Sequence, residues 1–126
     1  MPKKRPVPKP KPPRTLQELS LRPYHGRLWL ARTRQTYERA HQRIFSEPDV
    51  LTCAQEGRFA AGSGKTNGLW TYLIYAEKPH SLAHELAHVV LHTFQRAGID
   101  PREANGEPFC YLLSQLLLEA NPSGQV

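Results

Sequence analysis

Two histidines and a glutamate stand at a spacing that suits metal chemistry. They lie in the segment His84-Glu85-Leu86-Ala87-His88, an H-E-x-x-H pattern. If the segment is helical, four residues advance the helix by about 6 Å and turn it by about 400°, so both imidazoles lie on one face. The two rings can then bind one tetrahedral zinc ion, and Glu85 can take a proton from zinc-bound water. The pattern predicts a hydrolytic zinc site; the alternative is a coincidental pair of helix histidines.

A catalytic zinc ion needs a third protein ligand and one open position. His92 continues the four-residue spacing, but on a straight helix it lies about 12 Å from His84 and cannot share one ion with it. We expect His92 to flank the site. Glu107, which opens the next predicted helix after eighteen intervening residues, is the predicted third ligand, and Glu103 is the alternative.

Tyr111 lies one helical turn beyond Glu107 and therefore shares its face. It is a candidate catalytic residue that stabilises an oxyanion or donates a proton, or else it is a core tyrosine. Tyr72 and Tyr75 are alternatives that are better explained by packing in a strand.

The elements that must position these residues follow from periodicity and from turn residues. Helices are predicted at 28–45, where Pro48 ends the pattern, at 82–97, and from 107 or 108 to 120. Ser81 is the expected N-cap of the second helix, and Gly98 is its expected stop. Strands are predicted at 50–54, 58–61 and 69–76, the last two forming a hairpin across 62–68. The expected fold class is therefore α+β, with an N-terminal helix, a small antiparallel sheet of about three strands and two C-terminal helices.

The turn at 62–68 contains Gly-Ser-Gly-Lys-Thr, which is part of a phosphate-binding pattern. The complete pattern, G-x-x-x-x-G-K-[ST], requires a glycine at position 59, where this chain has Phe59. The loop also precedes a predicted strand, whereas phosphate binding uses the start of a helix. We therefore exclude a nucleotide-binding loop.

The positive charge of the chain is concentrated at its N-terminus. Residues 1–14 contain six of the 17 basic residues, no acid and six prolines, while the other 11 basic residues balance the 11 acids. Prolines at this density favour an extended polyproline-II conformation. The segment is interpreted either as a basic arm that contacts nucleic acid or as a solvated leader that threads along a partner. Residues 15–126 are expected to form a single domain.

Two further features bear on the setting of the protein. The two cysteines, Cys53 and Cys110, are far apart and show no metal-ligand spacing, which favours a reducing compartment. No stretch reaches the roughly 18 apolar residues that a membrane span requires. We therefore expect no membrane association.

The H-E-x-x-H segment together with Glu107-Pro108-Phe109-Cys110-Tyr111 resembles the gluzincin arrangement. It is more closely similar to small metallopeptidase-like proteins encoded in bacteriophage genomes, in which the second helix opens with E-x-x-A-Y; here Cys110 replaces the alanine. The resemblance covers about residues 69–118. It implies a minimal zincin-like domain in which His84, His88 and Glu107 bind Zn²⁺ and Glu85 is the general base.

A more distant resemblance, to ImmA/IrrE-type peptidases, rests on His84–His92 and on Glu103-Ala104-Asn105. It implies that Glu103 is the third ligand and that a repressor-type protein is the substrate. Phe109 comes two residues later than that pattern expects.

These resemblances imply a zinc-dependent metallopeptidase that acts on a protein or peptide, in the cytoplasm of an infected bacterial host or in the phage particle. One alternative is a phage virion or assembly protein that contacts other phage structural proteins and has a structural or vestigial zinc site. Another is a protease tethered to DNA by the basic segment 1–14.

Overall fold

The computed structural model describes residues 16–65 and 69–121. The predicted basic segment 1–14 and the domain boundary at residue 15 lie outside the described residues. The described chain contains four strands, three α-helices and one short 3₁₀ helix: β1 (Leu16–Leu19), β2 (Arg27–Ala31), α1 (Arg34–Phe45), β3 (Gly57–Ser63), β4 (Trp70–Ala76), α2 (Pro79–Ala97), η1 (Glu103–Gly106) and α3 (Glu107–Ala120).

The four strands form one mixed sheet in the order β1-β2-β4-β3. β1 pairs with β2 and β3 pairs with β4 in antiparallel fashion, whereas β2 and β4 run parallel. The predicted α+β class is confirmed. The prediction of a small antiparallel sheet of about three strands is wrong, because a fourth strand is present and the central pair is parallel.

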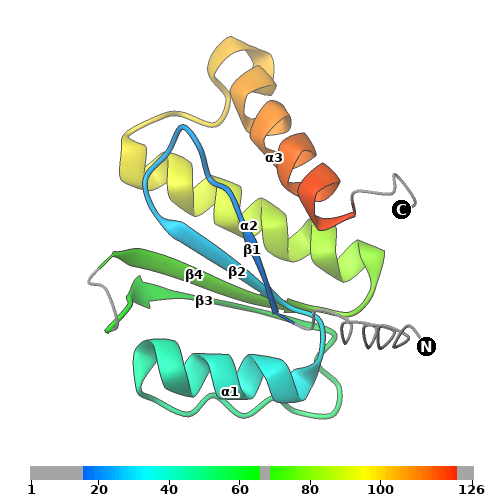
Figure 1. Ribbon diagram of the computed structural model, residues 1–126. Coiled ribbons are helices and arrows are strands. Elements are labelled where there is room, and N and C mark those ends of the chain that lie inside the picture. The colour runs from blue at the N-terminus through cyan, green and yellow to red at the C-terminus, as the bar shows by residue number, and fades with distance from the viewer. Residues whose placement is uncertain (1–15, 66–68, 122–126) are drawn as a thin grey trace, which may run out of the picture.

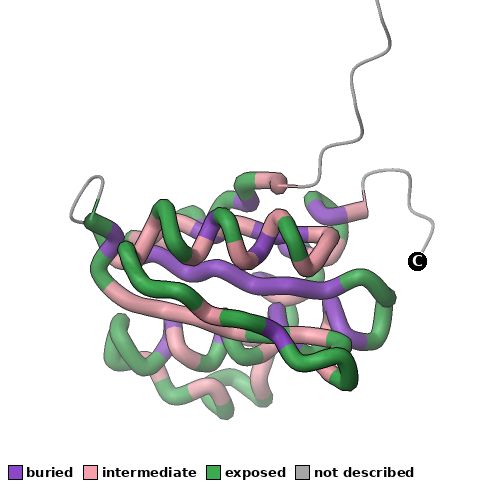
Figure 2. Tube along the Cα trace, turned by 90° about the horizontal axis from the view of Figure 1, so that it is seen from below, coloured by how far each residue is buried: buried purple, intermediate pink, exposed green. Residues whose placement is uncertain are grey.

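Helices cover both faces of the sheet. Figure 1 shows α1 beneath the sheet and α2 with α3 above it, with α3 packed across α2. Burial follows this arrangement: the trace is buried through the middle of the molecule and alternates between buried and exposed along the helices (Figure 2). No helix among the described residues is long and apolar enough to cross a membrane.

Alternate side chains of the central strands belong to two separate cores. Tyr72 and Ile74 pack with the α2 and α3 side chains, while Leu73 and Tyr75 pack against α1. This is the two-residue period of a strand that is buried on both faces. β4 ends at Ala76, and α2 begins shortly after it at Pro79.

The predicted helix at 28–45 starts too early. The helix begins at Arg34, and Thr33 caps it by accepting a hydrogen bond from the Thr36 N–H at 3.2 Å. Leu28 and Leu30 lie in β2, beside β4. A strand with apolar side chains on both faces lacks the alternation of a half-buried strand, which is why its leucines were assigned to the helical pattern.

The predicted strand at 50–54 is absent from the described chain. Side chains of α1 bind this part of the chain instead: the Leu51 N–H donates to Glu38 Oε1 at 3.1 Å, and the Tyr37 hydroxyl donates to Oδ2 of the preceding Asp49 at 2.6 Å. β1, by contrast, was not predicted.

The predictions for the later elements agree with the structure apart from the start of α2. β3 and β4 form the predicted hairpin, α3 spans 107–120, and Gly98 ends α2 with a φ of 72°. The helix begins at Pro79 with Lys78 as N-cap, so the predicted cap at Ser81 is wrong. Proline is favoured in a first helical turn, where its missing N–H costs no hydrogen bond.

Candidate metal centre

His84 and His88 lie side by side on the first half of α2. Their Nε2 atoms are 3.1 Å apart and the two ring planes meet at 78°. Both side chains are exposed, because the apolar positions of α2 that face the sheet lie on the other side of the helix. In the neutral state one ring can donate its N–H to the other, and in place of that proton a metal ion can bind both.

Glu85 points from the same helix toward the sheet and is buried, with 6% of its surface exposed. Its Oε1 atom lies 4.0 Å from His84 Nε2, so the carboxylate is next to the imidazole pair. Burial raises the pKa of Glu85, while the positive potential of the two histidines and of Arg58 counters this effect. A partly desolvated carboxylate beside two imidazole rings is an arrangement in which a carboxylate can act as a general base.

Strand β3 forms the wall against which Glu85 packs. A Cβ atom placed on Gly57 would lie 2.8 Å from Glu85 Oε1, closer than real contacts allow. Two residues along the strand, the Phe59 ring lies 5.8 Å from the His88 ring and 6.1 Å from the His92 ring, centroid to centroid. β3 therefore contacts Glu85, His88 of the imidazole pair, and His92 beyond it.

His92 belongs to an aromatic cluster one turn further along α2. Its ring stacks on Trp70 at 5.5 Å, and its Nδ1 lies 2.9 Å from the Tyr72 hydroxyl. Arg96 lies over the Trp70 ring at 5.1 Å. Burial and the Arg96 charge lower the pKa of His92, so both disfavour the protonated ring. This placement agrees with the prediction that His92 flanks the site.

The alternative tyrosines lie in different environments. Tyr72 belongs to the His92 cluster, whereas Tyr75 faces the opposite side of the sheet and packs 6.2 Å from the Tyr37 ring. The structure thus places Tyr75 outside the site.

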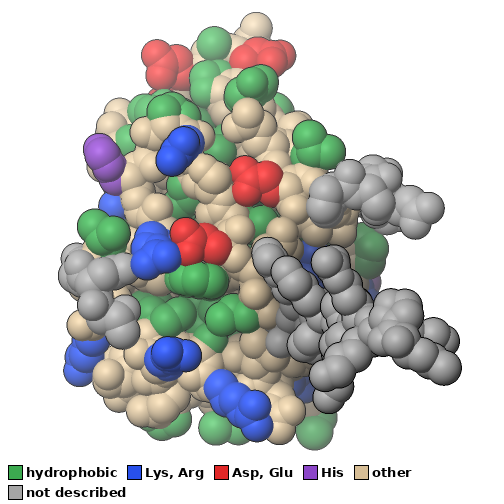
Figure 3. Space-filling model, in the orientation of Figure 1, with side chains coloured by type: hydrophobic (Ala, Val, Ile, Leu, Met, Phe, Trp, Pro, Cys, Tyr) green, Lys and Arg blue, Asp and Glu red, His purple; other side chains and the backbone are tan. Residues whose placement is uncertain are grey.

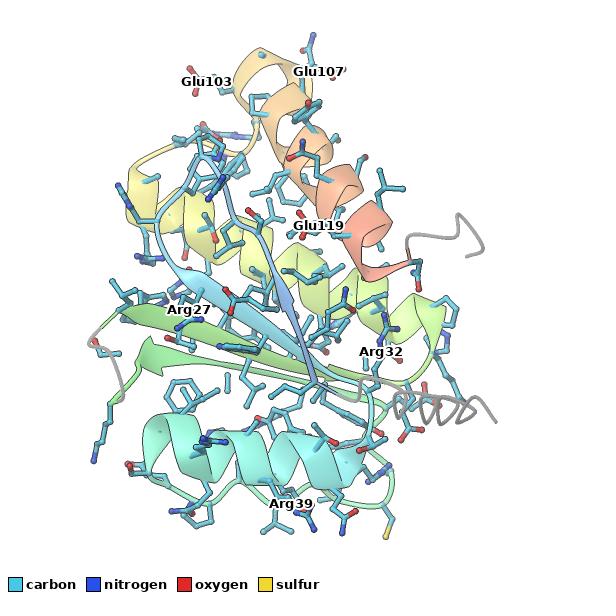
Figure 4. All side chains as sticks on the ribbon, viewed as in Figure 1. Arg27, Arg32, Arg39, Glu103, Glu107 and Glu119 are labelled. Carbon is cyan, nitrogen blue, oxygen red and sulfur yellow. The ribbon has the colours of Figure 1, made fainter. Side chains whose placement is uncertain are left out.

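Glu107 and Tyr111 are not gathered at the imidazole pair. They line a groove with Tyr24, and Figure 4 shows Glu103 and Glu107 at the outer tip of the molecule, where α3 begins. Among the residues that the structure describes, no group of three His, Cys, Asp or Glu side chains is arranged to hold a metal ion. The role of Glu107, or of Glu103, as third ligand therefore stays a prediction.

Two features near the imidazole pair were not predicted from the sequence. His80 extends the series, so four histidines follow one another at four-residue intervals along α2, and His80 Nε2 lies 2.9 Å from Glu56 Oε2. The spacing alone was sufficient to find His80. Gly57 could not have been found in this way, because nothing in its sequence neighbourhood indicates contact with Glu85.

The excluded phosphate-binding loop leads into strand β4, as predicted. Within its described part, the Lys65 N–H donates to the Ile44 carbonyl oxygen at 3.0 Å, so this amide is used by the fold.

Comparison with known proteins gives no relatives for this chain. No protein-family model matches it, and neither the curated proteins nor the solved structures yield a significant match.

Proposed function

We propose that this chain is a zinc-dependent hydrolase of peptide bonds, in which His84 and His88 bind the metal ion and Glu85 is the general base. One arrangement on α2 carries the proposal. The two Nε2 atoms are 3.1 Å apart, and a carboxylate oxygen lies 4.0 Å from one of them. Ligands for a metal ion and a base for its bound water thus occupy a single patch.

The donor atoms of the pair fit zinc. Two nitrogen ligands of a tetrahedral zinc ion, each bound at about 2.0–2.1 Å, are about 3.4 Å apart. The separation of the two Nε2 atoms is close to this value. A zinc ion held there would supply a Lewis acid and a bound water of lowered pKa.

Glu107 is retained as the proposed third ligand. Because no three-ligand group is present among the described residues, this role requires the connection between α2 and α3 to rearrange. The connection contains Ala104, Asn105 and Gly106 in succession at positive φ. A left-handed conformation costs roughly 1–2 kcal/mol for a residue with a Cβ, which favours a change of conformation at this point.

Glu85 is placed to move a proton at its Oε1 atom. Its burial raises the carboxyl pKa, and the carboxylate occupies the space that the missing side chain of Gly57 leaves beside the strand. A base whose pKa is raised toward the working pH accepts a proton and returns it to a leaving amine more effectively than an ordinary glutamate.

The edge of the sheet supports a peptide as the substrate class. β3 is the terminal strand in the order β1-β2-β4-β3, and its outer edge has no partner strand among the described residues. An extended peptide can add to such an edge through main-chain hydrogen bonds. Gly57 and Phe59 of this strand contact Glu85 and His88, so a peptide on the edge passes beside the proposed base and ligands.

Metal content and turnover of four variants test the proposal. We expect about one zinc ion per chain in the wild type, loss of zinc in His88→Ala, weakened zinc binding in Glu107→Gln, and full zinc without turnover in Glu85→Gln. His25→Ala, which removes an exposed histidine outside α2, is the matched control and should behave as the wild type. If Glu85→Gln cleaves a peptide library as fast as the wild-type protein does, Glu85 is not the general base. If the purified wild-type protein contains no zinc, the proposed metal site is refuted.

The exposure of the imidazole pair supports a second function, that of an assembly protein joined by zinc. The side chain of His84 is 67% exposed, so ligands from another molecule can complete the coordination. This function predicts that zinc raises the oligomeric state of the wild type and not that of His88→Ala, as measured by light scattering. Zinc binding without a change in mass leaves the hydrolase proposal in place.

A further inference from the structure

A hollow separate from the imidazole pair lies between the β1–β2 connection and the start of α3. It encloses about 460 Å³, and none of the four α2 histidines lines it. Its walls are largely apolar and include two tyrosines and two prolines. The residues that line it include Pro23, Tyr24, Glu107, Pro108, Tyr111 and Leu112.

Two tyrosine side chains, Tyr24 and Tyr111, line this groove from opposite sides. The Tyr24 ring is fixed by contact with Phe94, at 5.4 Å between ring centroids. Tyr111 on the facing wall is 67% exposed, an unusual position for a large side chain on a packed helix. Exposed rings bordered by prolines form the type of groove that accepts proline-rich segments in the polyproline-II conformation.

The chain itself contains a segment of this chemistry. Prolines occupy every second position from Pro6 to Pro12, and Pro10-Lys11-Pro12-Pro13 is a P-x-x-P sequence. A segment whose prolines already restrict φ loses little conformational entropy when it docks, which favours its binding to an apolar groove.

Charge also favours this segment. α3 carries two acidic residues, Glu107 and Glu119, and no lysine or arginine, while residues 1–14 carry six positive charges and no negative one. Figure 3 shows acidic side chains at the end of the molecule where α3 begins, whereas most lysines and arginines on this face lie lower, toward the sheet and α1. Arg22 lies on the opposite wall, so the attraction for lysines is concentrated at the Glu107 side of the groove.

The segment is long enough to reach the groove. Gln17 Nε2 donates to the Glu119 carbonyl oxygen at 3.0 Å, so the described chain starts beside the last turn of α3. From Glu119 back to Glu107 the helix covers about 18 Å. Fourteen residues in a polyproline-II conformation span roughly 43 Å, so residues 2–13 can extend along α3 and enter the groove.

We propose that the proline-rich segment 2–13 docks intramolecularly in the Tyr24–Tyr111 groove. The short tether gives the segment an effective concentration in the millimolar range, so weak apolar contacts suffice for docking. The proposal does not depend on metal binding, and its test uses the metal-free full-length chain.

The test places a nitroxide spin label on the segment and measures the loss of amide NMR signals. Val7→Cys carries the label in a full-length chain with Cys53→Ser and Cys110→Ser, since both natural cysteines are exposed. We expect strong signal loss at Tyr24, Glu107 and Tyr111, and none on α1. Tyr111→Ala, and separately replacement of the three prolines of the P-x-x-P sequence by alanine, should restore the groove signals while the remaining spectrum shows a folded protein.

Three results would overturn the proposal. The first is a groove with undiminished signals in the labelled chain. The second is equal signal loss in Tyr111→Ala, which would mean that the segment passes nearby without using the groove. The third is signal loss in isotope-enriched chains that carry no nitroxide, when they are mixed with chains that carry the nitroxide but are not isotope-enriched. This loss would identify the occupant of the groove as the segment of a second copy.

Discussion

Gly57 and Glu85 are in contact across the β3–α2 interface, and the contact leaves no space for a side chain on the strand. A Cβ atom on Gly57 would lie 2.8 Å from the Glu85 Oε1 atom and 3.1 Å from its Cγ atom. The carboxylate of the proposed base therefore occupies the space that the missing side chain of Gly57 leaves free. The first prediction concerns this contact.

We expect the added methyl group of Gly57→Ala to displace the Glu85 carboxylate and to reduce turnover by about tenfold to a hundredfold. A displacement of about 1 Å in a catalytic group can slow a reaction by about a hundredfold. Zinc content should be unchanged, because the imidazole pair is not touched. Gly62→Ala on the same strand is the matched control: its nearest neighbour is a Phe45 ring carbon at 3.5 Å, an ordinary contact. Equal turnover in both variants would show that Gly57 does not position the base.

The raised pKa of Glu85 predicts how stability depends on pH in the metal-free protein. Burial disfavours the charged carboxylate in the folded state, so this group makes no difference below the unfolded pKa of about 4.3 and destabilises the fold increasingly as the pH rises through the folded pKa. We therefore expect Glu85→Gln to equal the wild type in acid and to exceed it in stability at neutral pH. Urea unfolding at a series of pH values measures the difference in unfolding free energy between Glu85→Gln and the wild type. A difference that is largest in acid would contradict a raised pKa of Glu85.

The Tyr37–Asp49 hydrogen bond is expected to stabilise the α1 side of the sheet. The hydroxyl donates to the carboxylate at 2.6 Å, and Arg58 Nε lies 3.0 Å from the same oxygen. Removing a hydrogen bond to a charged group costs about 1.5–3 kcal/mol, so we expect Tyr37→Phe to lose stability of this order at pH 7. Tyr111→Phe, at an exposed tyrosine, should change stability by no more than about 0.5 kcal/mol.

The same pair predicts a second pH dependence, of opposite sign to that of Glu85. Desolvation opposes ionisation of Asp49, but the hydrogen bonds from Tyr37 and Arg58 outweigh it and lower its pKa. This stabilisation is complete above the unfolded pKa and is lost as the pH falls through the folded pKa. The deficit of Tyr37→Phe should therefore shrink in acid; a deficit independent of pH would indicate lost packing instead.

Zinc should stabilise the wild type against unfolding. A ligand that binds only the folded state at a hundred times its Kd adds about 2.7 kcal/mol, and we expect a gain of this order that chelator removes. Because zinc binds neutral imidazole and therefore competes with protons, the gain should be smaller in acid than at neutral pH. Thermal unfolding with and without zinc measures it in wild type, His88→Ala and His25→Ala; an equal gain in all three would mean that zinc binds elsewhere.

The sequence by itself determined the features that depend on local geometry. The imidazole pair follows from the four-residue spacing on a helix, because 3.6 residues per turn bring such positions together whatever surrounds them. The β3–β4 hairpin and the Gly98 end of α2 were also predictable, since both depend on residues that are neighbours in the chain.

Tertiary structure alone decided what depends on pairing and packing between distant segments. Leu28 and Leu30 lie in a strand because β4 pairs with β2 in parallel, a partnership separated by some forty residues of chain. Gly57 restricts Glu85 only because α2 packs on β3, and Glu107 lies at the groove rather than at the imidazole pair because of the path of the α2–α3 connection. Spacing along the chain fixes distances within one helix, but it does not fix distances across a turn, where every residue adds two free backbone dihedral angles.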